Sequence, residues 1–80
     1  MRIFLIEDDK ALAEGISFTL QKEGYETEVY FTCRESREAL DNSQPDLVLL
    51  DWNLPDGDGL VLCREIFEKW KMPILMITAR

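Results

Sequence analysis

The segment from residue 46 to residue 59 constrains the fold more than any other part of the sequence. Within it, four consecutive apolar residues (47–50) lead directly into Asp51, and a loop with one proline and two glycines follows. An uninterrupted apolar run of this length is typical of a strand covered on both faces, as in a parallel sheet. We therefore expect Asp51 at the carboxyl end of a central strand, which is where open α/β sheets bind ligands.

Three other segments have the composition of strands, and helical patterns separate them. Residues 3–6 and 74–77 repeat the all-apolar pattern, whereas residues 27–31 are β-branched, aromatic and half polar, as expected nearer a sheet edge. Amphipathic helices are predicted over residues 10–23, 34–41 and 59–70. The order β-α-β-α-β-α-β predicts an α/β fold with a parallel sheet and right-handed crossovers.

The charge and length of the chain limit what it can bind. Its 80 residues are enough for one domain. With 16 acids, 9 bases and a net charge of −7, the segment is unsuited to binding nucleic acid by itself. A cation or a basic partner fits this charge better, although an acidic, well-hydrated surface explains most of it.

Cysteine usage and hydropathy point to the cytoplasm. Cys33 and Cys63 are 30 residues apart and the chain has no histidine, so neither a zinc site nor a disulfide framework is indicated. Reduced, space-filling thiols fit a reducing compartment. The longest apolar runs are about four residues, which is too short to span a membrane or to form the apolar region of a signal peptide.

Polar side chains follow three of the four predicted strands: Glu7 and Asp8, then Asp51, then Thr78. The carboxyl ends of parallel strands share one edge, so we expect these groups to converge. Converging carboxylates repel one another and need a counter-charge, which Mg²⁺ with oxygen ligands supplies. Such a metal would neutralise an incoming phosphoryl group and leave Asp51 as the nucleophile, with the Thr78 hydroxyl beside it.

Each of these residues also has an ordinary structural explanation when taken alone. Asp8 and Asp9 suit a helix N-terminus, Asp51 can cap a turn, and Thr78 can simply end a strand. Asp56 and Asp58 are interpreted as loop and capping residues. An EF-hand calcium loop starting at Asp51 is excluded, because its sixth and twelfth positions hold aspartate and leucine where glycine and glutamate are required.

Three motifs taken together resemble the receiver domain of bacterial two-component response regulators. They are IFLIEDD at residues 3–9, VLLDWNLPDGDG at residues 48–59 and PILMITAR at residues 73–80. The set extends over the whole chain in order, and the loop at residues 54–57 is most similar to the OmpR/PhoB-type transcriptional regulators. The resemblance implies a flavodoxin-like, doubly wound parallel sheet with strand order 2-1-3-4.

The resemblance also implies a role for each matching residue. Asp51 corresponds to the aspartate that accepts a phosphoryl group from a sensor histidine kinase. Asp8 corresponds to a direct Mg²⁺ ligand, and Glu7 to an acid that acts largely through metal-bound water. Asn53 corresponds to the position whose backbone carbonyl completes the metal site. Thr78 corresponds to the switch hydroxyl that moves toward the phosphoryl group on activation.

The family pattern extends further than these residues. It continues with another helix, a fifth strand followed by a lysine-proline pair, and a final helix, so residues 1–80 correspond to the N-terminal portion of a receiver domain. The family's phosphate-pairing lysine, its aromatic switch residue and its DNA-binding domain have no counterpart here. In the order 2-1-3-4, strand 74–77 becomes an apolar edge, so we expect a homo-oligomer formed through it or by exchange of elements.

The sequence thus favours a cytoplasmic signalling module rather than an enzyme: a phospho-acceptor that contacts DNA only through a domain absent from this chain. A receiver-like fragment without phosphotransfer competence is the main alternative. A small phosphatase of the haloacid-dehalogenase kind is the second. That class needs another acid two residues after the nucleophile, where this chain has Asn53.

Overall fold

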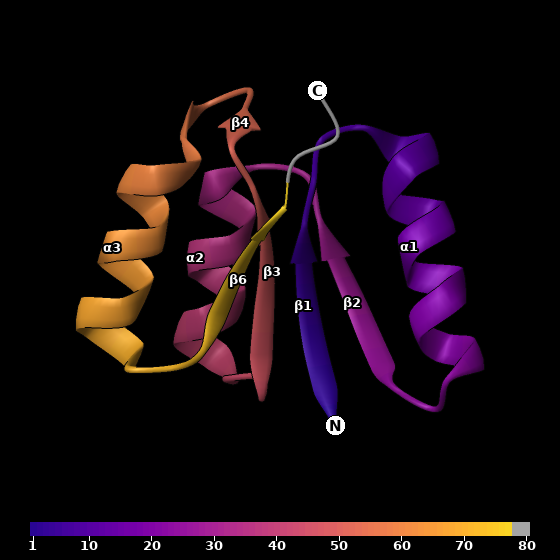
Figure 1. The fold of residues 1–80 in the computed structure, drawn as a ribbon. Helices are drawn as coiled ribbons and strands as arrows, with labels where there is room; N and C mark the ends of the chain where they lie inside the picture. The colour runs from indigo at the N-terminus through magenta and orange to yellow at the C-terminus, as the bar shows by residue number, and fades with distance from the viewer. Residues whose placement is uncertain (78–80) are drawn as a thin grey trace.

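The structure, a computed structural model, describes residues 1–77, and the predicted switch residue Thr78 lies outside this range. A four-stranded parallel sheet carries helices on both faces (Figure 1). The elements are β1 (Arg2–Ile6), α1 (Lys10–Lys22), β2 (Glu26–Tyr30), α2 (Cys33–Asn42), β3 (Leu47–Asp51), β4 (Asn53–Leu54), β5 (Gly57–Asp58), α3 (Gly59–Trp70) and β6 (Ile74–Ile77).

The strand order of the main sheet is β2-β1-β3-β6, and every pair in it is parallel. This confirms the predicted order 2-1-3-4, because β6 is the fourth strand of that sheet along the chain. In one register row, Leu5 pairs with Val29 on one side and with Leu49 on the other. The two all-apolar strands β1 and β3 therefore occupy the centre, as their sequences predicted.

Alternate residues of the strands pack into two separate hydrophobic cores, one on each face of the sheet. Phe4 and Leu50 face α2 and α3, where they pack with Leu62 and Ile66 of α3. On the other face, strand residues including Leu5 pack against α1. Because side chains alternate along a strand, one short sheet serves both cores.

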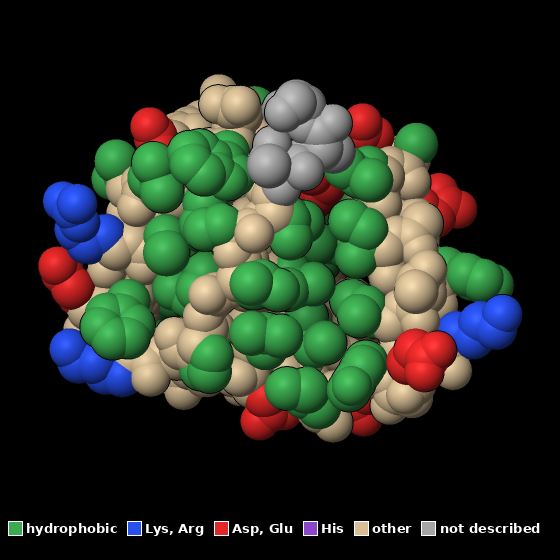
Figure 2. All heavy atoms as spheres, viewed as in Figure 1, with side chains coloured by type: hydrophobic (Ala, Val, Ile, Leu, Met, Phe, Trp, Pro, Cys, Tyr) green, Lys and Arg blue, Asp and Glu red, His purple; other side chains and the backbone are tan. Residues whose placement is uncertain are grey.

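The face that carries α1 is only partly covered by it. Figure 2 shows hydrophobic side chains gathered over the strands between α3 and α1. Leu75 of β6 is 56% exposed on the surface. Within the described residues β6 pairs with β3 alone, so its outer edge has no strand beside it.

Local signals set the ends of the helices. Asp9 caps α1 by accepting a hydrogen bond from the Leu12 N–H at 3.1 Å. Gly24 follows that helix with φ of 92°, a left-handed conformation that glycine adopts without steric cost. Asp58 caps α3 by accepting from the Leu60 N–H at 2.7 Å. These ends were predicted to within one residue.

The segment after Asp51 differs from the sequence prediction. Residues 52–58 were expected to form a loop, whereas β4 and β5 form an antiparallel hairpin in which Asn53 pairs with Asp58. Two-residue strands are too short to leave a periodic signal in a sequence. None of the helices described over residues 1–77 is long and apolar enough to cross a membrane.

Candidate functional site

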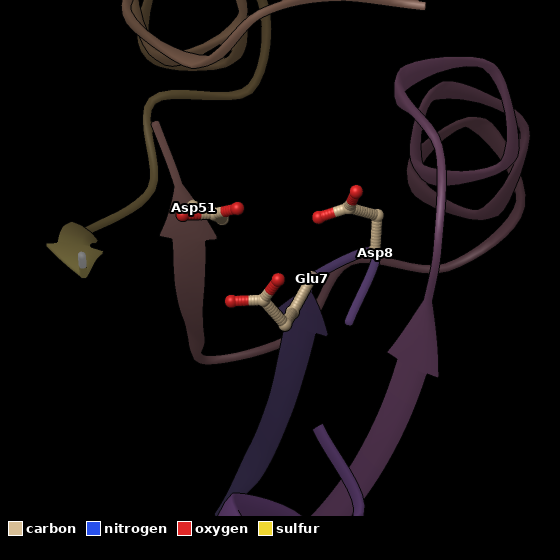
Figure 3. A group of neighbouring side chains, drawn as sticks. All are labelled: Glu7, Asp8 and Asp51. Carbon is tan, nitrogen blue, oxygen red and sulfur yellow. The ribbon is translucent and has the colours of Figure 1, made fainter. Parts of the chain in front are cut away.

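Three carboxylates meet at the carboxyl ends of β1 and β3. Glu7 and Asp8 follow β1, and Asp51 is the last residue of β3. One oxygen from each residue lies within 4.8 Å of the other two. Figure 3 shows the three side chains pointing toward one another. The predicted convergence of Glu7, Asp8 and Asp51 is therefore present in the structure.

Backbone hydrogen bonds hold these residues in place. The Glu7 N–H donates to the Tyr30 carbonyl at 3.0 Å, which extends the pairing of β1 with β2 by one residue. The Glu7 carboxylate accepts from the Asp9 N–H at 3.0 Å, and the Asp51 carboxylate accepts from the Trp52 N–H at 2.8 Å. Each of these two side chains is thus oriented by the chain that follows its own strand.

Two of the three carboxylates are buried. Glu7 is 1% exposed and Asp51 is 2% exposed, while Asp8 is half-buried. Burial raises the pKa of Glu7 above its usual 4.5, the Asp9 N–H opposes that rise, and the charge of Asp51 adds to it. Burial and the neighbouring Asp51 charge thus both disfavour the ionised form of Glu7.

Asn53 and Gly59 lie at the base of the hairpin that follows Asp51. The Gly59 N–H donates to the Trp52 carbonyl at 2.7 Å. A Cβ at Gly59 would lie 2.2 Å from the Asp51 carbonyl oxygen, so only glycine allows this approach. Asn53 is exposed.

Sequence reasoning did not identify the tight contact at Gly59. The residue was read only as the start of a helix. Its position eight residues after Asp51 carries no signal of close approach, because that contact exists only once the hairpin has formed.

The acidic cluster lies at the carboxyl edge of the sheet. A separate groove of about 440 Å³ runs between α1 and β2 and is lined by residues that include Phe18 and Phe31. None of the three acids lines that groove.

Comparison with known protein families identifies this arrangement. The family model for the response regulator receiver domain matches residues 3–80. The chain belongs to this family.

Solved structures of receiver domains have the same fold. The BeF3-activated N-terminal receiver domain of Klebsiella pneumoniae RstA is 34% identical, with a TM-score of 0.94 over 100% of this chain and 68% of that one. The non-phosphorylated HemR receiver domain of Leptospira biflexa is 39% identical, with a TM-score of 0.90 over 99% of this chain and 64% of that one.

A third similar structure contains a metal ion and a beryllium fluoride. It is the Thermotoga maritima response regulator TrrA in complex with Mg²⁺-BeF, which is 32% identical with a TM-score of 0.93 over 99% of this chain and 70% of that one. The present chain therefore spans about two thirds of the length of these three relatives.

Proposed function

We propose that this receiver domain accepts a phosphoryl group on Asp51 from a sensor histidine kinase in the cytoplasm, with Mg²⁺ bound beside it. The observation that carries the proposal is the convergence of Glu7, Asp8 and Asp51 within 4.8 Å at adjacent strand ends of a receiver fold. The Mg²⁺-BeF complex of TrrA supports it by similarity.

The residues present fit Mg²⁺. Glu7, Asp8 and Asp51 supply carboxylate oxygens, and the Asn53 backbone carbonyl lies two residues after Asp51 in the adjoining hairpin. Hard oxygen donors with excess negative charge are the ligand set that Mg²⁺ prefers. When bound, the ion would screen the charge of the phosphoryl oxygens near the carboxylates.

Asp51 is the nucleophile in the proposed reaction. One of its carboxylate oxygens bonds to phosphorus as the bond from phosphorus to the kinase histidine nitrogen breaks, and the imidazole keeps the electron pair and takes up a proton. The Trp52 N–H, 2.8 Å from Asp51 Oδ1, fixes the orientation of the carboxylate for this approach. Thr78, which lies outside the described residues, is proposed as the switch hydroxyl.

The proposed output is transcriptional control. Residues 1–80 are taken as the N-terminal portion of a receiver domain, and the loop at residues 54–57 resembles that of OmpR/PhoB-type regulators. DNA would be contacted through a separate output domain and not through this acidic segment, whose net charge is −7.

Phosphorylation can be tested with a small phosphoryl donor in the presence of Mg²⁺. We expect a base-labile acyl-phosphate adduct on the wild type that is absent in Asp51→Asn. Catalytic turnover of a phosphomonoester would instead support the phosphatase alternative. A folded protein that gives no adduct would support a receiver fragment without phosphotransfer competence.

We also propose that this chain self-associates through β6. Its outer edge has no strand beside it within residues 1–77, and Leu75 is 56% exposed. An apolar unpaired edge favours pairing with a second copy. Sedimentation that shows a well-folded monomer at micromolar concentration would contradict this proposal.

A further inference from the structure

The tip of the β4–β5 hairpin contacts the first turn of α2. Asp56 Oδ1 accepts a hydrogen bond from the Cys33 N–H at 2.7 Å, and Asp56 Oδ2 accepts one from the Arg34 N–H at 3.0 Å. Both carboxylate oxygens are therefore used on two successive backbone groups. Asp56 and Cys33 are 23 residues apart in the sequence, so this contact joins two separate parts of the chain.

The contact completes the capping of α2. Thr32 Oγ1 accepts from the Glu35 N–H at 3.1 Å, and the Glu35 carboxylate accepts from the Phe31 N–H at 2.9 Å. This local motif differs from a capping box in its second bond, which goes to the residue before the N-cap and not to the N-cap itself. This local motif does not reach the N–H groups of the first two helical residues, which an α-helix cannot satisfy internally. A carboxylate there also interacts favourably with the helix dipole.

The same hairpin packs tightly against α2. Leu54 is 8% exposed and belongs to the same core as Cys33. A Cβ at Gly57 would lie 3.0 Å from Cys33 Sγ. The hairpin therefore has one anchor at its tip, one in the core, and one at its base, where Gly59 bonds to the Trp52 carbonyl.

Asn53 lies between these anchors. Its backbone pairs with Asp58 across the hairpin, three residues before Asp56. The direction of the Asn53 carbonyl is thus set by the position of the hairpin as a whole. A change at the tip alters that position, since a two-residue strand pair has little rigidity of its own.

We propose that Asp56 is a positioning residue for the Mg²⁺ site: by holding the hairpin tip on α2, it fixes the Asn53 carbonyl beside the carboxylate cluster. This inference rests on the proposed function for the identity of the ion and its ligands. Groups that orient metal ligands typically contribute about 10-fold to 100-fold in metal affinity. Asp56 acts through its bonds to the Cys33 and Arg34 backbone, so we expect an effect at the low end of this range.

The test compares Asp56→Ala with Thr32→Ala in the full 80-residue chain. Thr32→Ala removes a cap from the same helix terminus but leaves the hairpin contact intact. Mg²⁺ affinity is measured by calorimetric titration with MgCl₂. Amide hydrogen exchange of residues 53–58 is measured without the ion. Its rate reports how often the hairpin opens, independently of metal binding.

We expect Asp56→Ala to weaken Mg²⁺ binding by about tenfold and to speed exchange in the hairpin, whereas Thr32→Ala changes the affinity less than about twofold. A folded Asp56→Ala whose affinity lies within about twofold of the wild type would overturn the inference. A wild type that binds no Mg²⁺ would overturn the proposed function, and the role of Asp56 at the metal site with it. Hydrogen exchange in the hairpin that is unchanged in Asp56→Ala would show separately that Asp56 does not hold the hairpin on α2.

Asp56→Asn covers the case in which Asp56→Ala does not fold. Asparagine keeps one carbonyl acceptor and loses the charge, so we expect an affinity between those of the wild type and the alanine variant. Hairpin exchange and Mg²⁺ affinity that both equal the wild-type values in Asp56→Asn would overturn the inference in that case.

Discussion

Gly59→Ala is expected to destabilise the domain and to displace Asp51, although glycine is ordinarily a poor helix residue. In α3, replacing the first residue by alanine would by propensity alone gain up to about 1 kcal/mol. The added Cβ, however, would lie 2.2 Å from the Asp51 carbonyl oxygen, 2.7 Å from the Trp52 carbonyl oxygen and 2.8 Å from Trp52 Cα. All three of these atoms belong to the backbone.

The size of the effect follows from these distances. The Asp51 carbonyl and the new methyl group must separate by roughly an ångström, and a close-packed interior does not absorb such a shift. Overpacking of this kind typically costs about 1–3 kcal/mol. The Gly59 N–H bond to the Trp52 carbonyl lies within the same crowded turn, so relief of the clash weakens that bond as well. We expect a net loss of about 2 kcal/mol in the free energy of unfolding.

Urea denaturation followed by circular dichroism measures this loss, and Mg²⁺ titration of the same variant measures the displacement of Asp51. Gly15→Ala is the matched control, because Gly15 lies within α1 and a Cβ there would meet nothing within 4 Å. That control should gain about 0.5–1 kcal/mol. A Gly59→Ala variant as stable as the wild type, with unchanged Mg²⁺ affinity, would refute the argument from close approach.

Three further predictions follow from charges and burial. Without Mg²⁺ at neutral pH, Asp51→Asn should raise the free energy of unfolding by about 1 kcal/mol, because it removes one of three converging charges. Urea denaturation curves should show that this gain disappears in saturating Mg²⁺. Burial and the charge of Asp56 raise the pKa of Cys33 to about 11, so a thiol reagent at pH 8 should modify Cys63 first and Cys33 only on unfolding. Equal rates of modification of the two thiols in the folded protein would contradict this. Arg37 lowers the pKa of Glu65 below 4.5, so their ion pair stabilises the fold above that pH and loses its effect as the pH falls through the lowered pKa. Because the two side chains are 41% and 38% exposed, Glu65→Gln should cost only about 0.5 kcal/mol at pH 7, and a cost that persists at pH 2 would be inconsistent with this origin.

The sheet could be predicted from sequence because apolar runs and strand-end acids are local features. The run at residues 47–50 and the acid that ends it predicted both the centre of the sheet and the position of Asp51. Parallel topology then placed Glu7 and Asp8 on the same edge without any information about distances. The structure agrees on each of these points.

The hairpin could not be predicted because its determinants are contacts between distant residues. Asp56 was expected to be a loop or capping residue, but nothing near it in the sequence shows that the helix it caps begins at Cys33. The need for glycine at position 59 likewise depends on where the Asp51 carbonyl lies after folding. The roles of all five site residues stay predictions: Glu7, Asp8, Asp51, Asn53 and Thr78.

β1 lies between β2 and β3 in the sheet, although it precedes both of them in the sequence. Its partner residues on β2 begin at Glu26, whereas those on β3 begin at Leu47. During synthesis β1 can pair with β2 early and must wait for β3, since long-range parallel pairing is slow and follows local contacts. We therefore expect Glu7 and Asp8 to be in place before Asp51 joins them. If Mg²⁺ binds as proposed, its binding during refolding would report when β3 docks beside β1.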